Sequence, residues 1–178
     1  MIVIGYQGIG KSTLAKNGNG WIDLESSNFY VDGKRSEDWF RIYGNIAFDI
    51  SKQGYNVMTP THAVLRQYLG EGLRNIWKTF YLSECVCACY PCHDLKDRGI
   101  ERLEHRYHYD MSEKNYRALM NAKDRFDDNI DEIESDCKKY DFVPVVIRDM
   151  NYNLKDLIDD TQKQWFIGRL PSFEPYSY

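Results

Sequence analysis

The sequence has no apolar run long enough to cross a bilayer and no segment with the composition of a signal peptide. It has no low-complexity tract and no internal repeat, which argues against a disordered or repeat protein. Positive charge is not in excess, since the net charge is -4, so nucleic acid and anionic membranes are disfavoured as partners. The 5 cysteines, an odd number, favour free thiols over a disulfide framework. We therefore predict a cytoplasmic monomer or homodimer that binds neither nucleic acid nor membrane.

What the sequence does contain is an alternation of short apolar strands with helical segments. A length of 178 residues suits a single domain, residues 1–178, with room for one inserted lid. Strands separated by helices predict a parallel sheet with helices on both faces, so we expect a three-layer α/β fold with five strands. The expected strands are residues 2–4, 21–25, 55–59, 85–90 and 142–147. Helical spacing is expected at residues 36–50, 64–70, 73–80, 94–107 and from 112 to about 133.

A glycine-rich segment joins the first expected strand to the first helix. Residues 5–12 read Gly-Tyr-Gln-Gly-Ile-Gly-Lys-Ser and match the phosphate-binding pattern Gly-x-x-x-x-Gly-Lys-Ser/Thr in full. In this pattern backbone N–H groups converge on phosphates, and glycines let the chain approach them closely. Lys11 is expected to reach the β- and γ-phosphates, and Ser12 to place its hydroxyl on Mg²⁺. The predicted nucleotide ligands are Gly5, Gly8, Ile9, Gly10, Lys11, Ser12 and Thr13.

The pattern of residues 5–12 is known as the P-loop. GTPases and ATP-driven motors are two classes of P-loop protein with further sequence motifs, and those motifs are absent here. The sequence has neither the Asp-x-x-Gly nor the Asn-Lys-x-Asp string of GTPases. The strand from Tyr55 runs into Thr-Pro-Thr-His rather than ending in the Asp or Asp-Glu of motor-like ATPases. A GTPase and an ATP-driven motor are therefore disfavoured.

The chain resembles the small P-loop kinases, the superfamily of adenylate, thymidylate and shikimate kinases, which includes small nucleotide kinases encoded by some bacteriophages. The resemblance spans most of the chain, with the P-loop as its specific motif. It implies the P-loop NTPase fold, ATP and Mg²⁺ as cofactors, and a bond from Thr13 to the α-phosphate. It also implies transfer of the γ-phosphate to a small-molecule acceptor, a nucleoside monophosphate or deoxynucleoside monophosphate, without a covalent enzyme intermediate.

Two acidic residues lie on the strand that follows the P-loop helix. In several of these kinases that strand ends in carboxylates that hold Mg²⁺-bound water or the acceptor, and Asp23 and Glu25 occupy the matching place. Alternation along a strand predicts that both carboxylates share one face. There Asp23 is expected to act on the metal shell, through water, or on the acceptor hydroxyl, with Glu25 beside the acceptor. A solvated strand end with ordinary charges stays open as the alternative.

Three arginines recur at helical spacing in a charged segment. Arg98, Arg102 and Arg106 lie at i, i+4 and i+8, so their side chains share one helix face. The segment resembles the lid of a nucleotide kinase, inserted at about residues 92–112. Lid arginines would stabilise the charge of the transferred group and exclude water. A solvated face paired with neighbouring acidic residues is the alternative.

A phosphorylated acceptor requires its own cations near the ends of the second and third strands. Arg66 is the first choice, because nucleotide kinases commonly place an acceptor-phosphate arginine just after the third strand. Thr61, His62 and Arg35 are the further candidates for acceptor contact. The chain lacks the adenylate kinase strings Thr-Gly-Asp-Leu-Leu-Arg and Gly-Phe-Pro, so the acceptor stays open. A kinase of an unphosphorylated nucleoside or other small metabolite, and a non-catalytic nucleotide-binding regulator, are the alternative functions.

A cluster of cysteines suggests a metal site at first sight. Cys85, Cys87 and Cys89 alternate along an expected strand, and Cys92 and His93 follow. These spacings differ from the paired Cys-x-x-Cys knuckles of structural zinc sites. Buried thiols that pack in the sheet are the favoured interpretation, with a structural metal as the alternative.

Overall fold

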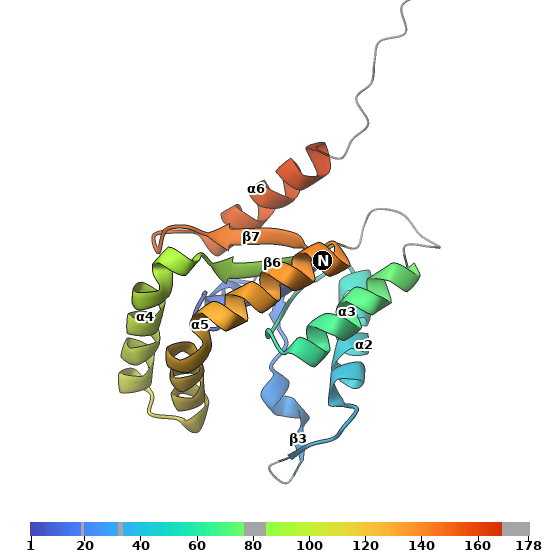
Figure 1. Cartoon of the computed structure of the whole chain (residues 1–178). Helices are drawn as coiled ribbons and strands as arrows, with labels where there is room; N and C mark the ends of the chain where they lie inside the picture. Colours follow the sequence, from blue (N-terminus) through green and yellow to red (C-terminus); the bar gives the residue numbers. More distant parts are fainter. Residues whose placement is uncertain (19, 32–33, 77–84, 169–178) are drawn as a thin grey trace, which may run out of the picture.

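A five-stranded, all-parallel sheet organises the chain in the computed structural model, which describes residues 1–18, 20–31, 34–76 and 85–168 (Figure 1). The strand order is β2-β5-β1-β6-β7, which confirms the predicted parallel sheet of five strands. A short antiparallel pair, β3 with β4, stands outside it. The strands are β1 (Ile2–Gly5), β2 (Trp21–Asp23), β3 (Tyr30–Val31), β4 (Lys34–Arg35), β5 (Asn56–Thr59), β6 (Val86–Pro91) and β7 (Val143–Ile147).

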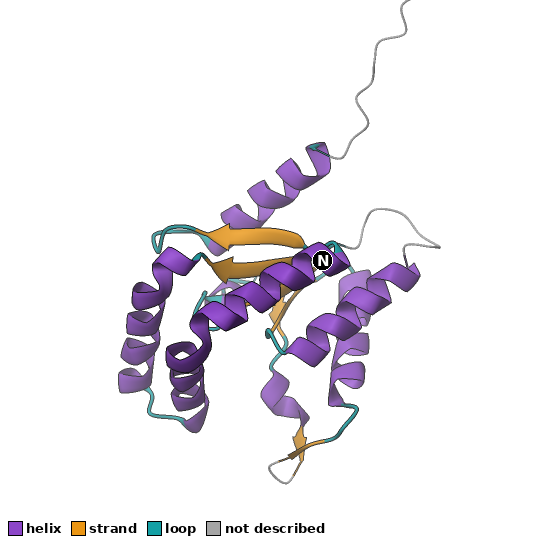
Figure 2. Cartoon of the chain, viewed as in Figure 1, coloured by secondary structure: helices purple, strands orange, loops and turns teal. Residues whose placement is uncertain are grey.

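Helices connect successive strands of the sheet and cover it on both sides. α5 runs across one side of the sheet and α6 lies on the other, as Figures 1 and 2 show. α3 packs against both α2 and α5. The helices are α1 (Lys11–Lys16), α2 (Trp39–Lys52), α3 (Ala63–Ile76), α4 (Lys96–Tyr109), α5 (Glu113–Tyr140) and α6 (Leu154–Ile167), with 3₁₀ turns at η1 (Ser26–Phe29) and η2 (His93–Leu95).

The path of the chain through the sheet reverses at β1. From this central strand the chain moves to β2 at one edge, returns to β5 beside β1, and then crosses to β6 and β7 on the other side. Loops leave the carboxyl ends of strands in opposite directions at such a reversal, which opens a crevice there. The segment that follows β1 therefore begins at the crevice.

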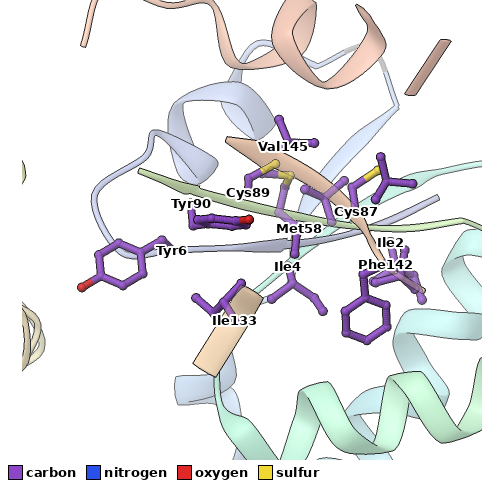
Figure 3. Close-up of a cluster of buried hydrophobic side chains, with 14 of the residues drawn as sticks. Ile2, Ile4, Tyr6, Met58, Cys87, Cys89, Tyr90, Ile133, Phe142 and Val145 are labelled. Atoms are coloured by element: carbon purple, nitrogen blue, oxygen red, sulfur yellow. The ribbon is translucent and has the colours of Figure 1, made fainter. Parts of the chain in front are cut away.

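The core is continuous through the two central strands. Residues of β1 and β6 are buried on both faces, because helices cover both sides of the sheet. The thiols of Cys87 and Cys89 pack within this core beside Met58 and Val145 (Figure 3). Cys85 is also buried, so these three cysteines are packing residues, as predicted. Within the part of the chain that the structure describes, the one cluster with metal-ligand spacing contains none of them.

The helix behind the third strand is longer than the predicted range of residues 64–70, so its predicted end at Gly70 is wrong. α3 continues through Gly70 to Ile76. A Cβ atom at Gly70 would lie 2.2 Å from the ring of Tyr140 in α5, so the glycine permits close packing of two helices. The second helical patch expected at residues 73–80 is thus partly the end of α3, and positions 77–80 lie outside the described residues.

Three further features were not predicted. The β3–β4 pair and α6 have no counterpart among the predicted elements. β2 ends at Asp23, two residues earlier than expected, so strand alternation does not extend to Glu25. None of the described helices is both long enough and apolar enough to span a membrane.

The chain forms a helical hairpin of its own beyond the sheet. α4 packs against the first part of α5 around a small cluster made by Leu103, Leu119 and Ala122. At Arg125 the backbone of α5 leaves helical geometry, with φ -138° and ψ 26°. The second part of α5 then packs in the main core, beginning with Phe126. We call residues 96–124 the helical hairpin; it extends past residue 112, where the lid was predicted to end.

Candidate active site

A cavity of about 860 Å³ opens at the carboxyl ends of β1, β2 and β5. Its lining comes from the glycine-rich loop of residues 5–12, which is the predicted P-loop, and from η1, the β3–β4 pair and the helical hairpin. It brings together most of the residues that the sequence predicted. Those that line it are Gly5, Gly8, Gly10, Lys11, Ser12, Thr13, Asp23, Glu25, Arg35, Thr61, His62, Arg66, Arg102 and Arg106. Two predicted residues do not line it: Ile9 is buried in the core, and Arg98 lines a separate, smaller pocket.

The backbone of the P-loop depends on its glycines. Gly8 and Gly10 have φ values of 79° and 97°, a region that side chains with a Cβ atom rarely adopt. At Gly5 the constraint is space, because a Cβ atom there would lie 2.6 Å from Cδ of Lys11. Replacing any of the three changes the path of the loop or displaces the lysine.

Lys11 folds back along the loop that it follows. Its Nζ donates hydrogen bonds to the carbonyl oxygens of Gly5 at 2.7 Å and Tyr6 at 2.8 Å. Burial lowers the pKa of Lys11 to about 8, although the carboxylates of Asp23 and Glu25 act in the opposite direction. The ammonium group is therefore held beside the cavity with its charge incompletely compensated.

Ser12 and Asp23 bring two oxygen ligands to the same point. The Ser12 hydroxyl donates to Oδ2 of Asp23 at 2.5 Å, linking the start of α1 to the end of β2. Hydroxyl and carboxylate oxygens suit Mg²⁺, which binds few protein ligands and keeps several of its waters. The pair fits the predicted magnesium site, and both residues line the cavity.

The cavity concentrates positive charge in a protein of net charge -4. Its described lining includes eight lysine and arginine residues but only four carboxylates. The cations are Lys11, Arg35, Arg66, Arg102, Arg106, Lys114, Arg117 and Arg125, and the acids are Asp23, Glu25, Glu113 and Glu132. Such a lining favours a ligand with several negative charges.

The three arginines expected on one helix face divide between two pockets. Arg102 and Arg106 line the main cavity. Arg98 lines a smaller pocket of about 360 Å³, which it shares with Glu101, Arg102, His105 and Met150. Successive i+4 positions drift around a helix of 3.6 residues per turn, so Arg98 and Arg106 point in different directions.

Tyr152, in the loop between β7 and α6, connects the helical hairpin to the P-loop. Its hydroxyl donates to the carbonyl oxygen of Ile9 at 2.8 Å, and Nη1 of Arg102 lies 3.3 Å from the same hydroxyl. Only the tertiary contact identifies this tyrosine.

Arg35, the last residue of β4, brings a cation to the cavity from the β3–β4 pair. Its guanidinium lies 4.5 Å from the ring centroid of Tyr30 and 4.3 Å from that of Trp39. It also donates to Ser26 at 2.9 Å and lies 3.3 Å from Nε2 of His62. Ser26 and Tyr30 line the cavity too and were not predicted, because a lone serine or tyrosine has no sequence signature of binding.

His62 is uncharged at neutral pH. Burial, followed by the nearby charges of Arg35, Arg66 and Lys11, lowers its pKa to about 4. The imidazole therefore accepts from Arg35 without neutralising it. Among the described carboxylates, none lies within ion-pair distance of Arg35.

Arg66, the first choice for an acceptor phosphate, is already engaged. Its Nε lies 2.6 Å from Asp136 and its Nη2 lies 3.4 Å from Glu132, both in α5. Its Nη1 donates to the carbonyl oxygen of Thr61. The side chain is only 4% exposed, although it reaches the cavity. In this arrangement Arg66 holds the loop after β5 against α5.

Helix α5 contributes cavity residues that the sequence did not reveal. Lys114 donates to both carboxylate oxygens of Glu25 at 2.7 Å, across the cavity. Gln7 of the P-loop donates to the carbonyl oxygen of Ala118 at 2.8 Å. The periodicity of α5 indicated only its apolar packing face, and the polar residues between those positions carry no separate signal.

No protein-family model matches the chain, and no curated protein is significantly similar to it in sequence. What the cavity binds therefore has to be inferred from its own residues. The Walker-type loop, the Ser12–Asp23 pair and the excess of cations all lie in this one place.

Proposed function

We propose that this chain is a P-loop kinase that transfers the γ-phosphate of ATP, with Mg²⁺, to a nucleoside monophosphate or deoxynucleoside monophosphate. The observation that carries the proposal is the concentration of cations around the P-loop. Four of the cavity's cations, Lys11, Arg35, Arg102 and Arg106, have no described carboxylate within ion-pair distance. Unpaired charge at the wall of a cavity favours a polyanionic ligand.

The distribution of these four cations matches two ligands of unequal charge. Lys11 belongs to the P-loop, and Arg102 and Arg106 face the cavity from α4. Arg35 comes from the separate β3–β4 pair. Three cations on the donor side suit a triphosphate, and one on the acceptor side suits a single phosphate group.

On the donor side, the P-loop backbone and Lys11 bind the β- and γ-phosphates, and Thr13 contacts the α-phosphate. The smaller pocket at Arg98 and Met150 adjoins this side through Arg102, which lines both pockets, and we assign the donor base to it. Tyr152 keeps Arg102 close to the loop, because its hydroxyl contacts both Arg102 and Ile9. This assignment gives Arg98 a binding role away from the phosphates.

Ser12 and Asp23 hold Mg²⁺, Asp23 directly or through a water molecule. The metal, when bound, neutralises charge on the β- and γ-phosphate oxygens. Asp23 also orients the acceptor hydroxyl or phosphate oxygen, since it ends β2, accepts from Ser12 and lines the cavity. Arg102 and Arg106 stabilise the charge on the transferred group and help to exclude water.

On the acceptor side, Arg35 binds the acceptor phosphate. Its orientation is set by Ser26, His62 and the flanking rings, all of which are uncharged, so its own charge stays available. Thr61, His62 and Glu25 border the same part of the cavity. An unphosphorylated acceptor would leave the charge of Arg35 uncompensated, which is why a monophosphate is preferred here.

The proposal is tested by measuring ADP release from ATP and Mg²⁺ across a panel of ribo- and deoxynucleoside monophosphates, nucleosides and small metabolites. Wild-type protein is compared with Lys11→Ala and with the matched control Lys16→Ala, an exposed lysine on the same helix. We expect acceptor-dependent turnover in the wild type and in Lys16→Ala, and its loss in Lys11→Ala.

Other outcomes would favour the alternative functions. Turnover with nucleosides or metabolites alone would indicate a kinase of unphosphorylated acceptors. Nucleotide binding without turnover for any acceptor would indicate a non-catalytic regulator. Absence of binding to every Mg-nucleotide would overturn the proposal as a whole.

A further inference from the structure

The kink at Arg125 joins two separately packed parts of the protein. Before it, the apolar residues Leu119 and Ala122 of α5 form a small cluster with Leu103 of α4, separate from the main core. After it, Phe126 and Ile130 belong to the main core with the sheet. Hinges are commonly a few residues that absorb a change in backbone angles between two rigid parts. The non-helical backbone of Arg125 lies at this boundary.

Glu132, two turns further along α5, contacts the side chain of the kink residue. One of its carboxylate oxygens lies 2.8 Å from Nη2 of Arg125. The other lies 3.4 Å from Nη2 of Arg66, which in turn holds the carbonyl oxygen of Thr61. One carboxylate therefore connects the kink with the loop on the acceptor side of the cavity.

All three members of this Arg125–Glu132–Arg66 group line the cavity. A ligand anion that enters there meets two arginines that share Glu132, and Arg66 is also paired with Asp136 at 2.6 Å. A carboxylate and a phosphate offer the same kind of acceptor oxygens to a guanidinium, so the two compete.

We propose that Glu132 couples occupation of the acceptor side to the position of the helical hairpin. This inference rests on the proposed function, since it assumes an anionic acceptor. Without acceptor, Glu132 holds Arg125 and Arg66 together and fixes the kink. When the acceptor phosphate draws either arginine away, the kink loses its contact and the hairpin changes position. A ligand shifts such an equilibrium only through a difference in affinity for the two states, which the competition with Glu132 supplies.

The coupling itself is tested without any ligand, by hydrogen exchange of the full chain. Arg125→Gln is made in the wild-type background and in a Glu132→Gln background. We expect Arg125→Gln to change the exchange rate of residues 61–66 by about threefold in the first background, the size an exposed ion pair allows, and to have no effect in the second. Asp128→Asn is the matched control, because Asp128 lies 3.7 Å from Arg125 and makes no described ion pair with Arg66. An equal effect in both backgrounds, or none in either, overturns the coupling.

The link to the acceptor is tested by steady-state kinetics with the monophosphate that turns over fastest. Glu132→Gln removes the competing carboxylate, so the KM for this acceptor should fall by about threefold while kcat also falls and the KM for ATP stays constant. If Glu132 had a purely structural role, the substitution would change the KM values for both substrates or for neither. Either result would contradict the proposed link between Glu132 and the acceptor. If no acceptor turns over, the proposed function and the acceptor link fail together, whereas the exchange experiment still decides the coupling.

Discussion

Lys114 and Glu25 form an ion pair across the cavity, with the ammonium nitrogen 2.7 Å from both carboxylate oxygens. One residue belongs to the helical hairpin and the other follows β2, and they are 89 positions apart in the chain. The side chains are 55% and 36% exposed, so the pair adds only about 0.2–1 kcal/mol. Its importance is geometric, because it connects the hairpin to the segment that follows β2.

Breaking this pair should loosen the hairpin without unfolding the protein. For Lys114→Gln we expect hydrogen exchange of residues 24–29 to rise by about two- to fivefold at low salt, with a smaller difference at about 1 M salt, where charges are screened. Lys123→Gln is the control, since the Lys123–Glu104 pair lies within the hairpin and has similar exposure. Equal effects of the two substitutions on residues 24–29 would contradict a cross-cavity role.

Nucleotide affinity should depend on pH through Lys11. The free protein loses the proton of Lys11 as the pH rises through its pKa of about 8, whereas a bound triphosphate favours the charged form. Binding therefore takes up a proton above about pH 8, and affinity should fall by up to about tenfold per pH unit there. Calorimetry in buffers of different ionisation enthalpy measures this uptake. Lys11→Arg should bind with little pH dependence, and a flat wild-type profile would exclude the mechanism.

Removing the charge of Arg35 should affect the acceptor selectively. Arg35→Met keeps an apolar chain between Tyr30 and Trp39 and loses a charge-assisted hydrogen bond worth about 1.5–3 kcal/mol. We expect the KM for monophosphate acceptors to rise by roughly 10- to 100-fold while the KM for ATP is unchanged. Arg41→Met, at an exposed position of α2, is the control. A parallel loss with nucleoside acceptors would argue against phosphate recognition by Arg35.

The helical hairpin should be able to unfold locally while the main core stays folded. Leu103 is 2% exposed, so Leu103→Ala should cost about 2–5 kcal/mol. Because Leu119 and Ala122, with which it forms a cluster, belong to the hairpin, we expect fast exchange in residues 97–124 with most of the sheet still protected. Ile130→Ala, in the main core, should instead lower the free energy of unfolding of the whole domain in urea. Equal loss of protection throughout the chain in both variants would mean that the hairpin is not an independent unit.

Much of the fold was predictable because its signals are local. Each central strand is a continuous apolar run, and α5 begins where its spacing predicts, with Ser112 accepting from the backbone N–H of Asn115. The exceptions follow from packing. Gly70 lies inside α3 rather than at its end, because the ring of Tyr140 packs where a Cβ atom would be. The kink at Arg125 has no proline or glycine at that position that would have predicted it from the sequence.

In the candidate site, too, the residues with a local sequence signal were predicted and those that depend on distant contacts were not. The P-loop residues and Asp23 were found because a short contiguous motif and a strand end place them. Lys114 and Ser26, which line the cavity, and Tyr152, which contacts Ile9 and Arg102, were missed because their partners are distant in the chain or carry no pattern. Arg66 was expected to face a ligand, yet its partners Asp136 and Glu132 lie 70 and 66 positions away.

The amino-acid sequence alone determined the parallel α/β architecture and the glycine-rich loop between β1 and α1, because periodicity and a glycine-rich turn act over a few neighbouring residues. Only the tertiary structure decided which cations stay unpaired, which arginines enter the main cavity, and where the helical hairpin joins the core. Those properties depend on which side chains meet across the cavity, and such meetings are set by the packing of helices on the sheet.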